Sequence, residues 1–150
     1  MLTFMKIDVL LEIFISISLI YACYTDIRWR RISNKYSLVI LLLSLVLGCY
    51  RETGVSVLIP ALILLTGFAF SLMGLVGAGD IKLVSALAVA LSPQEAASFL
   101  TFIGLAGIPL TLIVFLHYRF LMPQKKATLP YGVAISLGYW LQWFYLANYF

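Results

Sequence analysis

Hydrophobic and polar positions divide the chain into six apolar stretches separated by short polar segments. A membrane-spanning helix needs about 20 mostly apolar residues, and four of the stretches reach or approach that length. The second and fourth are shorter, but the placement of the basic loops is consistent only if they also cross. The pattern predicts an all-α membrane protein, a bundle of six transmembrane helices forming one domain over residues 1–150. The stretches are Ile7–Thr25, Tyr36–Tyr50, Val55–Val76, Asp80–Leu91, Ala96–Leu121 and Leu129–Phe150.

Composition supports lipid as the solvent of this chain. Hydrophobic residues make up 63% of the 150 positions and charged residues only 11%, whereas soluble domains carry about 25% charged residues. A chain with so few polar groups is unable to cover its surface with them. The net charge of +4 does not indicate nucleic acid as a partner, because the basic residues lie in short loops. The two cysteines are too few for a disulfide framework or a thiolate zinc site.

The basic residues are divided unequally between the two sides that six crossings define. Cytosolic loops carry an excess of Lys and Arg, so the distribution predicts a multi-pass protein of the inner (cytoplasmic) membrane with both termini outside. A cleaved signal peptide over residues 1–22 is the alternative, and the acids that follow Lys6 speak against it. The side predicted to be cytosolic carries Arg28, Arg30, Arg31, Lys35, Lys82, Arg119, Lys125 and Lys126, and the other carries Lys6 and Arg51.

The sequence lacks the residues that most classes of protease require. The chain has one histidine, His117, and no HExxH, whereas a catalytic zinc requires three protein ligands. No GxSxG and no Walker-type phosphate loop occur. Neither Cys23 nor Cys49 has a base nearby in the sequence. The acids remain as candidates, and no metal or organic cofactor is expected.

Two of the six acids are predicted to lie on the cytosolic side, each at the inner end of its stretch. An aspartyl protease uses two carboxylates that share one proton, one to activate a water and one to protonate the substrate carbonyl. If Asp80 to Pro93 is one helix of about 20 Å, Asp80 lies below the inner surface, where an acid indicates a function. The pair is Asp26 and Asp80, and the acids predicted toward the outer face are Asp8, Glu12, Glu52 and Glu95.

Small residues lead up to Asp80. Gly74, Gly77 and Gly79 leave the backbone free to bend, and they allow another helix or an extended substrate to approach closely. A plain turn between two spans is the simpler interpretation, but it does not explain an acid at the end of the turn within apolar sequence. The glycines are therefore interpreted as part of the site.

The sequence Gly77-Ala78-Gly79-Asp80, followed by Lys82, resembles the GxGD motif of intramembrane aspartyl proteases. Two further segments resemble motifs of the prepilin peptidases, and the three together cover about 20 residues. The first has an aspartate followed at fixed spacing by Arg, a hydrophobic residue and Asn, here Asp26, Arg28, Ile32 and Asn34. The third opens the last predicted helix with Pro130, Tyr131 and Gly132.

This resemblance implies a membrane aspartyl endopeptidase that cleaves the basic leader peptide of type IV pilin-like precursors at the cytosolic face. It implies Asp26 and Asp80 as the catalytic pair and assigns no firm role to the other motif residues. Each of those has a simpler interpretation: Arg28 as an orientation anchor, Asn34 as a helix cap, Lys82 as a side chain reaching the interface, and Pro130 as a helix start.

The chain departs from the larger family members, which carry a cytosolic domain with paired cysteines linked to N-methylation. No such methyltransferase domain is predicted here, so the compact chain resembles the Flp/Tad-type prepilin peptidases, with archaeal preflagellin peptidases as a nearby relative. A small proton-coupled transporter or a non-catalytic membrane scaffold is the alternative function. The sequence leaves open the precursor, the oligomeric state, which aspartate holds the shared proton, and whether the two aspartates touch without substrate.

Overall fold

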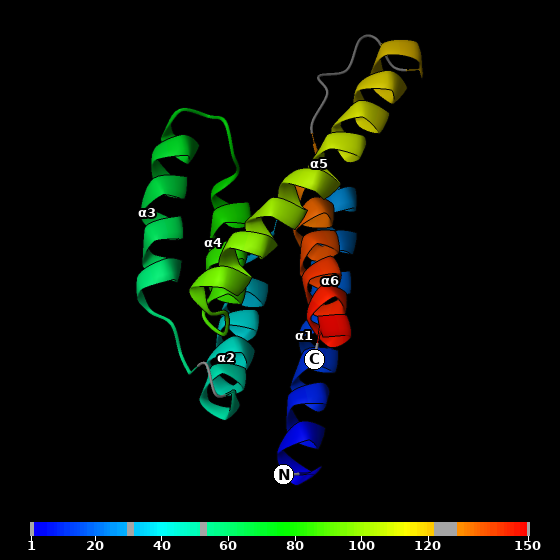
Figure 1. Cartoon of the computed structure of the whole chain (residues 1–150). Helices are drawn as coiled ribbons and strands as arrows, with labels where there is room; N and C mark the ends of the chain where they lie inside the picture. Colours follow the sequence, from blue (N-terminus) through cyan, green and yellow to red (C-terminus); the bar gives the residue numbers. More distant parts are fainter. Residues whose placement is uncertain (1, 30–31, 52–53, 122–128, 150) are drawn as a thin grey trace.

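The computed structural model describes residues 2–29, 32–51, 54–121 and 129–149. This part of the chain contains six α-helices and no strand, which confirms the all-α prediction (Figure 1). Successive helices run in alternating directions, so that the N- and C-terminal ends lie toward the same end of the bundle (Figure 1). The helices are α1 (Leu2–Trp29), α2 (Asn34–Tyr50), α3 (Leu58–Leu72), α4 (Ala78–Ala88), α5 (Pro93–Leu121) and α6 (Tyr131–Tyr149).

Several helix ends differ from the predicted stretches. Helix α1 continues to Trp29, so Asp26 lies inside its last turn and does not end the helix. Helix α3 ends at Leu72, and Gly74 follows with a φ of 73°, a conformation that glycine adopts easily. Helix α4 ends at Ala88, so the prediction of unbroken helix from Asp80 to Pro93 is wrong. A turn at residues 89–90 follows α4, and α5 begins separately at Pro93, where the N–H of Ser92 donates to the Glu95 carboxylate.

Helix α4 lies at the centre of the packing, between α2, α3 and α6. Its side chains from Leu83 to Ala88 are all buried. On the other side of the bundle α6 packs against α1 and α5 (Figure 1). Glycines permit close approach in both places: a Cβ at Gly67 would lie 2.5 Å from Ile81, and one at Gly138 would lie 2.7 Å from Ile103. Small residues at such contacts are typical of helices that pack in membranes.

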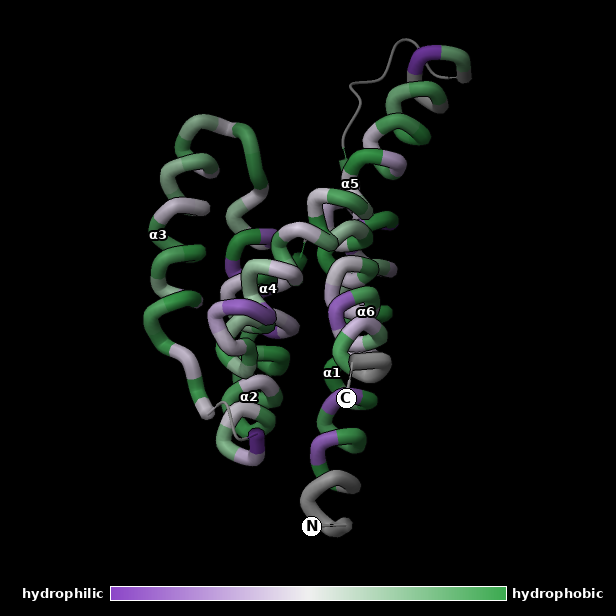
Figure 2. The backbone as a smooth tube through the Cα atoms, in the orientation of Figure 1, coloured by the Kyte–Doolittle hydropathy of each residue, from purple (hydrophilic) through white to green (hydrophobic). Residues whose placement is uncertain are grey.

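The outward-facing surface is mostly apolar. Figure 2 shows hydrophobic residues along most of α3, while the strongly hydrophilic positions elsewhere are confined to short segments. Within the described residues, two helical segments are long and apolar enough to cross a membrane: Ile7–Trp29 and Pro93–Leu116, with mean hydropathies of 1.9 and 2.4. Helices α2 and α3 are apolar but shorter, and α4, with 11 residues, is about 16 Å long. The count of six crossings therefore stays a prediction.

An ion-pair cluster forms where the N-terminal part of α1 meets the end of α2 and the start of α5. Arg51 contacts Glu12 at 2.6 Å and lies 3.8 Å from Glu95. The hydroxyl of Tyr139, on α6, donates to the second oxygen of Glu12 at 2.7 Å. The sequence predicted these charged residues on the face opposite Asp26 and Asp80, and none of them lines the pocket that holds the two aspartates.

Replacing Arg51 by Met is expected to lower the free energy of unfolding by about 3 kcal/mol, because Glu12 would remain buried without its cation. Chemical denaturation of the detergent-solubilised protein measures the change. Arg119→Met, at an exposed position near the end of α5, is the matched control and should stay within about 0.5 kcal/mol of the parent. Equal stabilities of the two variants would show that the cluster does not stabilise the fold.

Candidate active site

The start of α6 holds Asp26 in place. Asp26 is 6% exposed, and its Oδ2 accepts a hydrogen bond of 2.8 Å from the backbone N–H of Gly132. Gly132 is the second residue of α6, where backbone amides lack partners within the helix and the helix dipole favours a negative charge. The prediction that a helix begins after Pro130 is confirmed.

Gly132 leaves no room for a larger residue. A Cβ at this position would lie 2.9 Å from Oδ2 of Asp26 and 3.2 Å from its Cβ. The carbonyl of Gly132 accepts hydrogen bonds from the Cys23 thiol at 3.6 Å and from the Ser136 hydroxyl at 2.8 Å. Glycine is therefore required by the contact with Asp26, and the resemblance pointed to this residue without giving that reason.

Asp80 is the third residue of α4, which confirms the prediction that it begins a helix. It is half-buried, and its carboxylate lies over the backbone of Gly77, the residue that precedes the helix in extended conformation. A Cβ at Gly77 would lie 2.6 Å from Oδ2 of Asp80. A side chain at this position would therefore push the carboxylate away.

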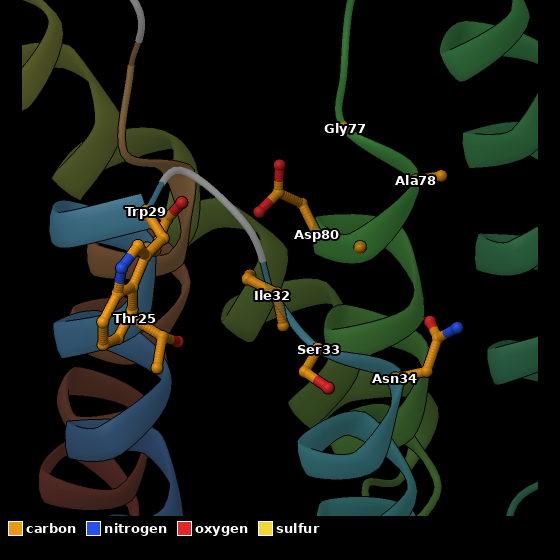
Figure 3. A pocket seen from close by; sticks show the side chains of 10 residues that line it. Thr25, Trp29, Ile32, Ser33, Asn34, Gly77, Ala78 and Asp80 are labelled. Atoms are coloured by element: carbon orange, nitrogen blue, oxygen red, sulfur yellow. The ribbon is translucent and has the colours of Figure 1, made fainter.

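Both aspartates line one pocket of about 630 Å³. Its wall comes from the end of α1, the connection to α2, and the segment that enters α4. In Figure 3 the carboxyl group of Asp80 points from the start of α4 toward α1 and Trp29. The lining residues are Thr25, Asp26, Trp29, Ile32, Ser33, Asn34, Gly77, Ala78, Gly79 and Asp80.

Gly79 brings the two sides of the pocket together. A Cβ at Gly79 would lie 3.3 Å from the Cβ of Ile32 and 3.4 Å from its carbonyl oxygen. The start of α4 thus lies directly against the backbone that leads into α2. The sequence predicted a close approach at this glycine, and the partner is a segment of the chain itself.

Two other motif residues meet each other beside the pocket. The ammonium group of Lys82 donates to Oδ1 of Asn34 at 3.0 Å, joining α4 to the start of α2. The prediction that Asn34 caps α2 is wrong, because the capping residue is Ser33, whose hydroxyl accepts from the N–H of Lys35. Asn34 points instead toward α4 (Figure 3). The contact anchors the segment that forms one wall of the pocket.

The remaining motif residues take separate positions. The guanidinium of Arg28 lies 5.5 Å from the ring centroid of Trp29, a cation–π contact at the end of α1. Arg28 does not line the pocket, whereas its neighbour Trp29 does. Tyr131 lines an apolar cavity on the other side of Asp80. Arg30 and Arg31 lie outside the described residues.

The contact between Lys82 and Asn34 predicts non-additive effects on activity. Lys82→Met and Asn34→Leu should each lower the activity by about fivefold, and the double variant should lose little more, because either change already breaks the single hydrogen bond. Initial rates for all four proteins complete the cycle. If the loss in the double variant equals the product of the two single losses, the two residues act independently.

The fold and pocket define a class: helical proteins in which two aspartates from different helices face one open cavity. The profile of the type IV leader peptidase family matches residues 13–117, well over half of the chain. The chain belongs to the type IV leader peptidase family. The matched region contains Asp26 and Asp80 and ends before α6, so the contact of Gly132 with Asp26 is an observation of the structure alone. Neither a curated protein nor a solved structure matches the chain significantly.

The family and the two long apolar helices indicate a membrane protein. The surface agrees with this conclusion, because large apolar side chains are exposed along the helices, among them Ile17, Leu65 and Ile113 at 56%, 70% and 64%. A soluble monomer rarely exposes contiguous apolar surface of this extent.

Proposed function

We propose that the protein is a membrane aspartyl endopeptidase that removes the basic leader peptide of type IV pilin-like precursors at the cytosolic face. The observation that carries the proposal is the pocket into which α1 and α4 bring Asp26 and Asp80. Membership of a leader peptidase family supports a peptidase over the transporter or scaffold that the composition also allowed.

The proposed reaction uses one proton held between the two carboxyl groups. The ionised aspartate takes a proton from a water molecule as the water oxygen attacks the scissile carbonyl carbon, while the protonated aspartate donates to the carbonyl oxygen. The tetrahedral intermediate then breaks its C–N bond, and the leaving amine takes up a proton from the pair. The N–H of Gly132 keeps the Asp26 carboxylate in position through this cycle.

The proposed orientation places the pocket at the cytosolic ends of α1 and α4 in a bundle of six crossings. Helix α4 is about half as long as the hydrocarbon core is thick, so it does not cross the core alone. In the proposed orientation the segment before Ala78 completes the crossing, and Asp80 therefore lies below the membrane surface. Arg28, Lys35 and Lys82 lie around this end and make it basic. A basic leader is therefore selected by pockets for its backbone and side chains, since simple charge attraction would not select it.

Co-expression with a pilin-like precursor tests the proposal. We expect mass spectrometry of the membrane fraction to show the precursor shortened by its leader, with cleavage undiminished by a chelator. An intact precursor beside normally accumulated enzyme would contradict the proposed function. Inhibition by the chelator would point to metal-dependent chemistry.

A further inference from the structure

A second cavity adjoins Asp80 on the side facing α3, α5 and α6. Its volume is about 300 Å³, at the lower end of the range for ligand pockets. Asp80 is the one residue that lines both this cavity and the larger pocket. Apart from Asp80, its walls are formed almost entirely by apolar and aromatic groups, including Ile63, Phe70, Ile103 and Ile135.

The two spaces on either side of Asp80 differ in polarity. The larger pocket presents Thr25, Ser33, Asn34 and both aspartates at the end of the bundle that we propose is cytosolic. The apolar cavity lies farther along the helices, between α3 and α6, where the outer surface is also apolar. A chain that runs past Asp80 from one space to the other thus changes from polar to apolar surroundings.

We propose that this apolar cavity is the subsite for the hydrophobic side chains that immediately follow the cleaved bond of the precursor. The inference rests on the proposed function and adds to it the direction in which the substrate binds. The leader lies in the polar pocket and the apolar helix of the precursor extends toward the cavity, which puts the polarity change of the substrate at Asp80. Entry is lateral, because Thr66 and Phe70 of α3 are exposed at the cavity's outer side.

Thr66→Phe tests the assignment by filling the cavity. The Thr66 hydroxyl bonds only within its own helix among the contacts of the described residues, to the carbonyls of Leu62 and Ile63, so its replacement disturbs no contact between helices. Thr101 on α5 is the matched control, because its hydroxyl also bonds the carbonyl four residues earlier and it lines none of the cavities described above.

Two precursors serve as probes, one with Phe and one with Ala at the first position after the cut. Thr66→Phe should lower kcat/KM for the Phe precursor by about tenfold and change that for the Ala precursor by less than twofold, while Thr101→Phe leaves both unchanged. Equal losses on both precursors, or no loss on either, would overturn the subsite.

Phe70→Ala tests the same cavity in the opposite direction. Its smaller side chain should raise the relative cleavage of a precursor with Trp after the cut by severalfold, and unchanged selectivity in this variant would also overturn the inference. The parent enzyme and Asp80→Asn are assayed with the same precursors, which distinguishes failure of the proposed function from failure of the subsite. If the parent cleaves no precursor, the proposed function fails; if it cleaves them and cavity variants keep its selectivity, only the subsite fails.

Discussion

Asp26→Asn and Asp80→Asn should each reduce leader cleavage by at least about a hundredfold, while the protein still accumulates in the membrane. An amide can neither take a proton from water nor donate one as an acid, and positioned acid–base groups contribute about 10²–10⁴-fold to a rate. Asn has nearly the same shape as Asp, so the bond from Gly132 and the packing at the pocket are expected to persist. The measurement is the fraction of co-expressed precursor that is shortened, normalised to the amount of enzyme.

Glu95→Gln is the matched control for loss of a carboxylate. Glu95 lies at the start of α5, where its Oε2 accepts a 2.7 Å hydrogen bond from the N–H of Ser92, a bond that Gln can also accept. Its activity should stay within about twofold of the parent. Cleavage by either aspartate variant at the parental rate would show that the pair does not carry the reaction, and an equal loss in Glu95→Gln would point to a general effect of charge removal.

Gly132→Ala should reduce activity by about ten- to a hundredfold without removing any reacting group. The added methyl carbon would lie 2.9 Å from Oδ2 of Asp26, so the carboxylate has to move away from both the helix start and its working position. Displacement of a reacting group by about 1 Å costs on the order of 10² in rate. The assay is the same precursor cleavage, with the thermal stability of the purified variant measured alongside it.

Gly104→Ala separates this local effect from the general cost of changing a helical glycine. A Cβ at Gly104 meets nothing within 4 Å, and Ala is favoured over Gly inside a helix by up to about 1 kcal/mol. This variant should be as active as the parent and at least as stable. Full activity in Gly132→Ala would mean that the contact with Asp26 is unimportant for the reaction.

Local sequence patterns predicted the helices, and the sequence also carries a signal for the start of α5. Ser92, Pro93 and Glu95 form a helix start in which Ser92 and Glu95 exchange hydrogen bonds, and this pattern places the start of α5 at Pro93, three residues before the predicted start. The sequence alone did not predict that Ser33, and not Asn34, caps α2. Asn34 instead accepts a hydrogen bond from Lys82, 48 positions away, a contact that local sequence does not show.

Motif spacing and loop charges predicted that Asp26 and Asp80 share one end of the bundle, and the structure brings both to one pocket. The partner of Asp26 was not predictable from helix periodicity, because Gly132 is 106 positions away and the contact depends on how α6 packs against α1. The apolar cavity beside Asp80 was likewise hidden, since four helices contribute to it and no single segment carries its pattern. Packing between distant helices therefore supplies what local sequence lacks.

The two aspartates lie on helices, α1 and α4, that have little direct contact with each other. Asp26 lies on α1 and is held by the start of α6, whereas Asp80 lies on α4, and both α2 and α6 pack against each of these two helices. The gap between the carboxyl groups thus depends on how α1 and α4 are tilted relative to each other through the helices that lie between them. Helices adjust their tilt to the thickness of the bilayer, so the lipid composition of the host membrane would set the turnover rate, and reconstitution into short- and long-chain lipids should produce different rates from the same protein.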